Sequence, residues 1–474
     1  MEEQTGISRR TTLKTLGAVG VLGAAGMSGT ATAESGSLLD DAFDLATSAL
    51  QESLVVFDSN DDVDRLGELD LANGYHGFEV LPVGYTELST DQLTTVADWE
   101  EVRFVRKNVE LEYYNDDAAD VTGADQVQAN EGYTGENVHT AVIDSGIDGA
   151  HPDHQENLVH NYRWVGNPLG EPTLWVDAGP LDTDDNGHGT HCSGTVAGDG
   201  SASDGEFEGM APDADLTVYS AGLTLLVVKP VAAYDHLLAR VRDGETDVQV
   251  VSNSYGSSNG EDFNPDGPLN VATWEAFERD LLSVFAAGNS GPGTGTLNQY
   301  AKAPNVLGVA ATNDEKAVTG FSSRGRQDAN YDRAAALSNL RSYRDTGSAS
   351  GTLGIYRPGV GAPGNAIVST MNPADPLAAS SSDDGRLYYA TISGTSMACP
   401  AVAGIATLAY DAYNRNNSGT PAPEDVIYTV EAEAEKALSS YTPYNVGSGF
   451  VDATSLVSRA ETGDWAAYSE VTLP

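Results

Sequence analysis

The sequence contains little positive charge and little cysteine. Its 474 residues include 24 Lys and Arg residues against 70 Asp and Glu residues, which gives a formal net charge of -46. Phosphate binding needs clustered cations, so this composition argues against a nucleic-acid partner. The two cysteines, Cys192 and Cys399, are too few for a disulfide framework. With 40% hydrophobic residues, the chain has enough apolar side chains for a buried core instead.

The excess of negative charge is spread along the chain and is not confined to one tail. Self-repulsion of this size destabilises a compact state unless salt screens it, and the screening length falls to about 3 Å at about 1 M salt. The composition therefore predicts a protein of a halophile. The alternative is a mildly acidic surface in an ordinary medium.

Residues 1–33 have the pattern of an export signal. Paired arginines in SRRTTLK (8–14) precede an apolar stretch rich in Gly and Ala (16–29), and an A-x-A cleavage pattern follows at 31–33. We therefore expect a twin-arginine signal peptide, a role for the twin-arginine export machinery and a secreted protein. A membrane anchor is the alternative, although the stretch is short for a bilayer span. No later segment is long and apolar enough to span one.

Residues 34–117 are typical of a small separate α+β unit. We expect strands at 54–58, 75–81 and 102–113, and helices at 62–69 and after the capping box of Ser89 and Gln92. This alternation of strand and helix predicts a ferredoxin-like fold. The acidic stretch 115–120 would link this unit to the next domain.

Residues 118–474 have the pattern of one α/β domain. Apolar runs occur at 138–144, 215–221, 248–254, 281–287 and 305–311. Strands that are apolar on both faces and alternate with helices predict a parallel sheet that helices cover on both sides. We expect the polar segment 324–354 to be a surface insertion and 372–386 to be a loop.

Three polar residues lie where predicted strands end or helices begin. Asp144 ends the first strand, His188 opens a helix in NGHGTH, and Ser396 opens another in SGTSMACP. Active sites of open parallel sheets lie at the carboxyl ends of the strands, so the three side chains could meet there. A neutral hydroxyl needs a base to take its proton and a carboxylate to orient that base. Taken singly, a helix cap, a structural histidine and a turn aspartate would explain them, but the combination favours nucleophilic catalysis.

The order Asp, His, Ser along the chain is that of the subtilisins, and it differs from the order in chymotrypsin and in the α/β-hydrolases. The surrounding motifs resemble the signature blocks of the subtilisin-like serine proteases, in particular those of the haloarchaeal halolysins. These motifs are DSGID (144–148), HGTHCSGTVAG (188–198), GMAPDA (209–214), AAGNSGP (286–292), GVGAPG (359–364) and GTSMACP (394–400). The resemblance covers about residues 121 to 453. It implies a subtilisin-like three-layer α/β fold with a mostly parallel central sheet.

The resemblance also implies the catalytic roles. Asp144 would orient the base, His188 would act as general base and acid, and Ser396 would be the nucleophile. Asn289 would donate to the tetrahedral oxyanion together with the backbone N–H of Ser396. The implied activity is serine endopeptidase hydrolysis through an acyl-enzyme, which requires no cofactor for catalysis.

The segment SNSYG (252–256) resembles the strand on which the family binds an extended peptide. Ser254, Tyr255 and Gly256, with Ala287 and Gly288, would line the primary specificity pocket. The small Ala and Gly side chains predict cleavage after large apolar residues, and pairing through the backbone predicts broad specificity. Tyr255 replaces the more usual Leu, which leaves the fine preference open.

Residues 34–117 resemble the propeptide of the family, an intramolecular chaperone and inhibitor. The partners expected are thus the chain's own propeptide and its protein and peptide substrates. Removal of this segment would give a new N-terminus near residues 115–122. An ordinary N-terminal domain that the mature enzyme retains is the alternative.

Asp153, in HPDHQENL, resembles a calcium-binding position of some family members, with the loop 199–208 near the other ligands. A structural Ca²⁺ ion and a solvated acidic turn are both open at this point. His151 and His154 could instead suggest zinc, but a loop role is favoured for them.

We expect the two cysteines to be buried reduced thiols, and a disulfide is the alternative, which would need their Cα atoms within about 7 Å. A cysteine-nucleophile mechanism has no dedicated His or Asn motif here. Two other functions were weighed against the endopeptidase. One is a binding protein with a dead site, which the intact triad argues against. The other is a hydrolase of esters, which the peptide-binding strand argues against.

Overall fold

The computed structural model describes residues 38–40, 42–113, 121–170, 173–257, 260–380 and 386–474. Its contacts divide the chain into Met1–Gly36 and Ser37–Pro474. The first unit, which holds the expected signal peptide of residues 1–33, lies outside the described residues. Within the described part, no helix combines the length and the apolar character that crossing a bilayer requires.

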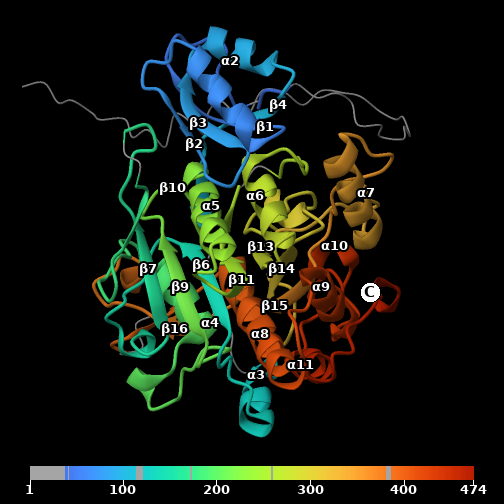
Figure 1. Cartoon of the computed structure of the whole chain (residues 1–474). Helices are drawn as coiled ribbons and strands as arrows, with labels where there is room; N and C mark the ends of the chain where they lie inside the picture. Colours follow the sequence, from blue (N-terminus) through green and yellow to red (C-terminus); the bar gives the residue numbers. More distant parts are fainter. Residues whose placement is uncertain (1–37, 41, 114–120, 171–172, 258–259, 381–385) are drawn as a thin grey trace, which may run out of the picture. The chain divides into compact units, whose positions relative to one another are not determined.

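An antiparallel sheet of four strands forms the first domain (Figure 1). The strands are β1 (Gln51–Phe57), β2 (Tyr75–Gly77), β3 (Val83–Leu88) and β4 (Val102–Lys107), in the spatial order β2-β3-β1-β4. The 3-10 helix η1 (Asn60–Glu68) and the helix α2 (Thr90–Ala97) connect them. The expected capping box is present, since Ser89 accepts from the Gln92 N–H at 3.3 Å and Gln92 from the Ser89 N–H at 2.9 Å. The elements follow the order strand, helix, two strands, helix, strand, which is a ferredoxin-like order with one more strand than the sequence predicts.

Three details of this domain differ from the sequence prediction. The strand expected at 75–81 ends at Gly77, and β3 was not expected as a separate strand. The strand expected at 102–113 is two strands, because β4 ends at Lys107 and β5 (Glu110–Tyr113) pairs elsewhere. β5 lies between β10 (Leu225–Leu226) and β12 (Tyr255–Gly256) of the second domain.

The second domain is built on a sheet of eight strands in the order β15-β14-β13-β11-β6-β9-β7-β8. The strands are β6 (His139–Asp144), β7 (Leu158–Trp164), β8 (Trp175–Asp177), β9 (Asp215–Ser220), β11 (Val248–Asn253), β13 (Leu282–Ala286), β14 (Leu307–Thr312) and β15 (Val360–Pro363). All neighbours are parallel except β7 and β8. The five apolar runs of the sequence are confirmed as strands of this sheet, whereas β7, β8 and β15 were not expected.

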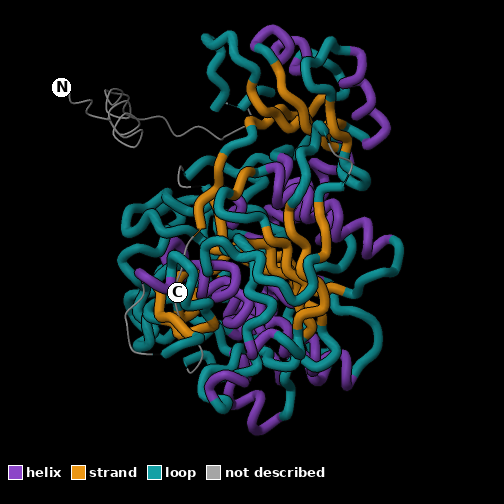
Figure 2. The backbone as a smooth tube through the Cα atoms, turned by 90° about the vertical axis from the view of Figure 1, so that its left-hand side faces the viewer, coloured by secondary structure: helices purple, strands orange, loops and turns teal. Residues whose placement is uncertain are grey.

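Helices cover both faces of the large sheet (Figures 1 and 2). On one face lie α4 (His188–Ala197), α8 (Thr395–Asn416) and α11 (Ala453–Thr462), and on the other lie α5 (Val228–Arg242) and α6 (Pro268–Phe277). Each strand contributes side chains to the hydrophobic core on both faces of the sheet, because successive side chains point to opposite faces. In β6, Val142 packs into the α8 core, whereas Ala141 and Ile143 pack into the α5 core. The three-layer prediction is thus confirmed.

Further elements complete the second domain. They are α3 (Ala124–Gln126), η2 (Val127–Glu131), η3 (Pro152–His154), η4 (Ser201–Ser203), η5 (Tyr300–Lys302), α7 (Arg333–Thr346), β16 (Ile367–Thr370), η6 (Ala378–Ser380), β17 (Tyr389–Ile392), α9 (Pro423–Glu433), α10 (Pro443–Val446) and η7 (Tyr468–Glu470). The loop expected at 372–386 lies between β16 and β17, which pair as a hairpin, and its residues 381–385 are outside the described part.

The segment 324–354 is more than a surface insertion, because it contains the helix α7. Arg333, the first residue of this helix, is fully buried and its guanidinium meets Glu431 of α9 at 2.8 Å. Arg357 pairs with the other oxygen of the same carboxylate at 2.7 Å, and all three side chains are 0% exposed. Burial alone would raise the pKa of Glu431, but the two arginines outweigh it and hold that pKa below its usual value. The insertion is therefore anchored by a buried ion triad.

We predict that Glu431→Gln destabilises the protein by about 3–5 kcal/mol, because two buried guanidinium groups lose their counter-charge. The measurement is the free energy of unfolding in denaturant at fixed salt. Glu245→Gln is the control, because the Glu245 side chain is 59% exposed beside Arg240, and such a pair contributes about 0–1 kcal/mol. Equal losses in the two variants would contradict a special role for the buried triad.

Candidate active site

The candidate catalytic residues gather at the carboxyl ends of the parallel strands. Asp144 is the last residue of β6, and Ser254 follows β11 directly. Asn289 lies three residues after the end of β13. His188 and Ser396 lie in the first turns of α4 and α8, the two helices that pack together under this edge. Segments far apart in the chain thus meet at one rim, as the sequence predicts.

Asp144 and His188 form the central pair of the site. Oδ1 of Asp144 lies 2.5 Å from Nδ1 of His188 and also accepts from the Ser145 N–H at 2.7 Å. The two side chains are 0% and 1% exposed. With Nδ1 donating to the carboxylate, Nε2 is the basic nitrogen of the neutral ring. This tautomer suits a general base.

Asp184 and Ser145, which the sequence analysis missed, hold the start of α4. Oδ1 of Asp184 accepts from the Gly187 N–H at 2.9 Å, and Oδ2 accepts from the Thr190 N–H at 2.8 Å. The Ser145 hydroxyl donates to Asp184 and accepts from the Gly189 N–H, both at 2.8 Å. An aspartate just before a helix is a common cap, so the position of Asp184 four residues before His188 was the available signal. Together, the hydrogen bonds of Asp184 and Ser145 fix the position of His188.

Ser396 and Ser254 are joined by two hydrogen bonds. The Ser396 hydroxyl donates to the Ser254 carbonyl at 2.9 Å, and the Ser254 hydroxyl donates to the Ser396 carbonyl at 2.7 Å. The sulfur of Cys192 lies 3.6 Å from Nδ1 of His188 and 3.7 Å from the Ser396 carbonyl oxygen. One atom thus touches both the base and the nucleophile residue, which places the three candidate residues in a single cluster.

The two cysteines are free and fully buried, as expected. Burial raises the pKa of the Cys192 thiol well above its usual value, and the Asp144 carboxylate adds to this effect. Burial also raises the pKa of the Cys399 thiol, to about 11. A thiol needs to ionise in order to attack, so neither cysteine is suited to be the nucleophile.

Asn289 lies beside the start of α8. Its side-chain oxygen accepts from the Thr395 N–H at 2.8 Å and from the Thr395 hydroxyl at 3.1 Å. The amide oxygen is thereby used, so the NH₂ group of Asn289 is turned away from Thr395. An NH₂ group and the backbone N–H of Ser396 at the helix N-terminus can then act as two donors to one anionic oxygen.

The expected substrate-binding residues lie together next to Ser396, with one correction. Ser254 and Gly256 flank Tyr255 on β12, and Ala287 and Gly288 follow β13. The Tyr255 side chain is 0% exposed, and its hydroxyl donates to Oδ1 of Asn253 at 2.7 Å. It therefore packs into the core and does not line a pocket. Its backbone is the part that faces β5, so the prediction for Tyr255 was wrong in its side chain only.

Both carboxylate oxygens of Asp153 accept hydrogen bonds from within the chain. Its Oδ1 accepts from the Ala202 N–H at 2.8 Å, and its Oδ2 accepts from the Tyr389 hydroxyl at 2.6 Å. His151 is also used, because its Nδ1 accepts from the Asp153 N–H at 3.1 Å and its Nε2 lies 2.9 Å from the Tyr388 carbonyl oxygen. This buried set fits a structural role better than a metal site.

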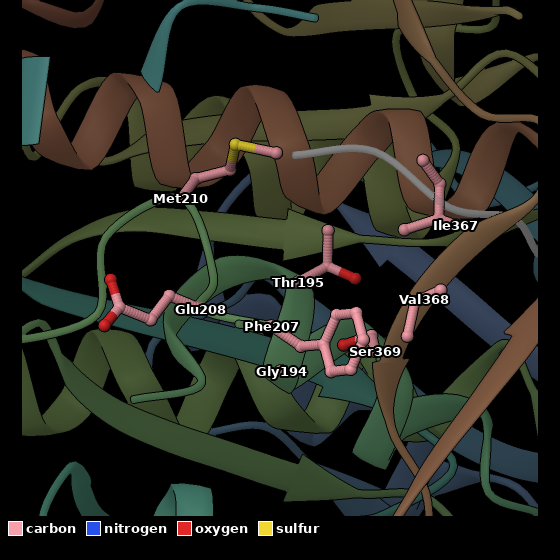
Figure 3. A pocket seen from close by; sticks show the side chains of 8 residues that line it. All are labelled: Gly194, Thr195, Phe207, Glu208, Met210, Ile367, Val368 and Ser369. Carbon is pink, nitrogen blue, oxygen red and sulfur yellow. The ribbon is translucent and has the colours of Figure 1, made fainter. Parts of the chain in front are cut away.

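A small pocket lies beside the 199–208 loop (Figure 3). It lies between α4, β16 and the end of the loop, and it is lined by Gly194, Thr195, Phe207, Glu208, Met210, Ile367, Val368 and Ser369. Glu208 is the single ionisable side chain among these lining residues. Burial raises the pKa of Glu208, with further help from Asp213 and Asp199. One carboxylate among mostly apolar walls does not match the six to eight oxygen ligands of Ca²⁺.

Comparison with known proteins agrees with this geometry. The model of the subtilase family (Peptidase_S8) matches residues 135–449. The chain belongs to the subtilase family. Its curated relatives include the serine protease AprX of Bacillus subtilis (strain 168), which is 31% identical over 65% of this chain and 64% of AprX. Another is a subtilisin of Bacillus sp. (strain TA39), 31% identical over 59% of this chain and 58% of that subtilisin. The subtilase thus spans less than two thirds of the length of these relatives.

Solved structures share the fold. Sphericase has a TM-score of 0.52 at 26% identity, over 71% of this chain and 99% of sphericase. Fervidolysin from Fervidobacterium pennivorans, described as a keratinolytic enzyme related to subtilisin, has a TM-score of 0.61 at 20% identity. That match covers 89% of this chain and 62% of fervidolysin, and it shows the fold alone.

We predict that Asn289→Ala lowers turnover by about 10²- to 10³-fold and leaves KM nearly unchanged, because the lost donor acts on the tetrahedral oxyanion. The measurement is steady-state hydrolysis of a chromogenic peptide. Asn289→Asp is the matched variant, since it keeps an oxygen acceptor for Thr395 but loses the NH₂ donor, and it should lose at least as much turnover. A normal rate in the Asp variant would mean that Asn289 serves only to anchor Thr395.

Proposed function

We propose that this subtilase is a secreted serine endopeptidase of broad specificity that is adapted to high salt. The observation that carries the endopeptidase activity is the placement of β5. Tyr113 of β5 pairs with Tyr255 and Glu112 with Gly256, antiparallel to β12, while Leu111 pairs with Leu225 on the other side. An extended segment of the chain thus lies between two strands, one of which begins next to Ser254, the residue whose carbonyl accepts from the Ser396 hydroxyl, as an extended peptide substrate would.

The proposed reaction follows from the positions of five groups. His188, oriented by Asp144, takes the proton of Ser396 as the hydroxyl turns from the Ser254 carbonyl to attack the peptide carbonyl. The oxyanion receives hydrogen bonds from Asn289 and from the Ser396 N–H. The protonated ring then gives its proton to the leaving amine, and water hydrolyses the acyl-enzyme by the same route in reverse. Each step uses groups of this chain, so we propose that catalysis needs no cofactor.

The specificity proposed is for large apolar residues before the cut. Ala287 and Gly288, which follow β13, and Gly256 on β12 have small side chains or none, which would leave room for a large apolar side chain of the substrate. Pairing through β10 and β12 uses main-chain atoms and so ignores most side chains of the substrate. This combination supports broad cleavage with one preferred side-chain class.

We propose that residues 34–117 are the propeptide, which docks on the catalytic domain. The buried Asp235 of α5 accepts from the backbone N–H groups of Glu79, Val80 and Leu81, at 2.8 to 3.1 Å. Arg242 of the same helix meets Glu79 at 2.5 Å. A carboxylate that caps three N–H groups of the partner domain is a specific contact, and it supports an inhibitor that stays bound while β5 fills the substrate strand.

Strand β4 adds a charged contact between the two domains. Arg106 meets Glu261 at 3.0 Å and Asp40 at 3.1 Å, and Arg103 pairs with Asp266. Asp266 also accepts from the Tyr343 hydroxyl of α7, so the 324–354 insertion supports the residue that holds Arg103. Two of the few cations in this acidic protein are thus placed against its catalytic domain.

Ser396→Ala should abolish casein clearing at high salt and should leave the chain uncut. The wild type should clear casein and show a new N-terminus within residues 115–122 by mass spectrometry. The last described pair, Tyr113 with Tyr255, lies next to Ser254 and Ser396, which favours the start of that range. Circular dichroism of the variant checks that it is folded.

The outcomes of this assay separate the alternatives. Ester cleavage without casein clearing in the wild type would favour the ester hydrolase, and no turnover of either substrate would favour the binding protein. An active enzyme that keeps residues 34–117 would refute the propeptide while leaving the protease intact.

Export and salt adaptation rest on the sequence, and we propose both. The paired arginines at 8–14 support the twin-arginine pathway, and the relation to halolysins is proposed on the same motifs and charge. A net charge of -46 supports a need for screening.

We predict that the melting temperature rises when NaCl is raised from about 0.1 M to about 1 M, because the screening length falls from about 10 Å to about 3 Å. The measurement is a thermal scan of Ser396→Ala, to prevent autolysis, with EDTA present. KCl at equal ionic strength is the control and should give the same rise. An unchanged melting temperature would contradict the proposed adaptation.

A further inference from the structure

The pairing of β5 with the catalytic domain continues beyond the N-terminal end of β5. β10 leads directly into α5, and Val227 lies between them. The Val227 N–H donates to the Val109 carbonyl at 3.0 Å. The Val109 side chain packs against the core cluster that includes Val227 and Val228. The residue before β5 thus adds one main-chain bond and one apolar contact to the pairing with β10.

Asn108, one residue earlier, reaches the start of α5 with its side chain. Its Oδ1 accepts from the N–H of Val228, the first residue of the helix, at 2.9 Å. Its Nδ2 donates to the Glu52 carboxylate, so the amide oxygen is the end that faces the helix. Asn108 is 8% exposed, and water therefore competes little for this bond.

The residue that precedes α5 does not cap the helix. Val227 has an apolar side chain, which offers no acceptor to the first N–H groups. Pro230, the third residue of α5, has no N–H. Removal of residues 34–117 would therefore take the acceptor from the Val228 N–H, at the start of a helix of 15 residues. An unpaired N–H at a helix start favours a new acceptor.

Contacts within the catalytic domain fix the start of α5 relative to the active site. The ammonium group of Lys229 donates to the Thr224 carbonyl at 2.7 Å and also to the Ala221 carbonyl. The Ala221 N–H donates to the carbonyl of the catalytic Asp144 at 2.8 Å. These bonds do not involve residues 34–117, so the start of α5 keeps its place when that segment is absent.

We propose that the substrate groove extends past β10 to the start of α5, where the Val228 N–H selects a short side-chain acceptor, namely Asn, Asp, Ser or Thr, at the substrate position that Asn108 occupies. An apolar residue at the position of Val109 completes the preferred pair. The inference rests on the proposed endopeptidase and propeptide, because the substrate takes the place that β5 leaves. Asn108 lies five residues before Tyr113, the residue that pairs with Tyr255.

The test uses quenched-fluorescence peptides with the sequence of residues 106–124 and the wild-type enzyme after removal of residues 34–117. All peptides carry Lys107→Gln, so that the peptides compared do not differ in charge. The change Asn108→Leu keeps the size of the side chain but removes the acceptor. It should lower kcat/KM by about 3- to 10-fold, which is the usual strength of a helix cap. Asn108→Ser restores an acceptor and should recover most of the rate.

The matched control moves the amide by one residue. A peptide with Asn108→Leu that carries Lys107→Asn in place of Lys107→Gln should stay as slow as the Asn108→Leu peptide. In the enzyme variant Val228→Pro the N–H itself is absent, and proline is common in the first turn of a helix. The ratio between the Asn108 and Asn108→Leu peptides should then fall to about 1. Both peptides are measured on the same variant, so a general change in activity cancels in this ratio.

Three results would overturn the proposal. One is equal rates for the Asn108 and Asn108→Leu peptides on the wild-type enzyme. Another is full recovery with the amide at position 107, and the third is an unchanged ratio in Val228→Pro. The peptides decide the question on the wild type even if that variant fails to fold. In each of these results the enzyme still cleaves peptides, so the proposed function stands. Cleavage of no peptide would instead refute the endopeptidase and this inference with it.

Discussion

The hydrogen bond between Asp144 and His188 is the contact on which the site depends. It joins the end of β6 to the start of α4, and burial of both side chains removes the water that would weaken it. Asp184 and Ser145 accept hydrogen bonds from N–H groups at the start of α4 and so hold the segment that carries His188. Cys192, one turn further along α4, contacts the Ser396 carbonyl oxygen at 3.7 Å and thus links α4 to α8.

The large sheet could be predicted where its strands are apolar on both faces. The five runs that were expected are central strands, because helices cover both of their sides. β7 (LVHNYRW) mixes polar residues with apolar ones, and β15 (VGAP) contains Gly and Pro, so neither has a strand pattern of its own. β7 and β15 form because they pair with strands that are distant in the sequence, and the pattern of residues within each segment does not show this pairing.

The site residues could be predicted because each lies in a short sequence motif that is typical of its catalytic role. Contacts between segments far apart in the chain could not be predicted in this way. Asp144, His188, Ser396 and Asn289 lie where their motifs placed them. The inward turn of Tyr255 depends on Asn253 and on the ring of Phe285, which the chain folds against it. The two-sided pairing of β5 was also invisible, because VELEY is an ordinary strand pattern that fits the N-terminal sheet equally well.

Arg333 anchors the 324–354 segment in the protein interior, which the polar composition of this segment does not indicate. A loop of this kind is normally a place where homologues gain or lose residues freely. Here the guanidinium at the start of α7 also holds the Pro304 and Val306 carbonyls, at 2.8 and 2.6 Å, in addition to Glu431. Trimming or grafting at this surface would thus have to retain α7, whose Leu337 and Leu340 are also buried, so the residues open to engineering lie outside this helix.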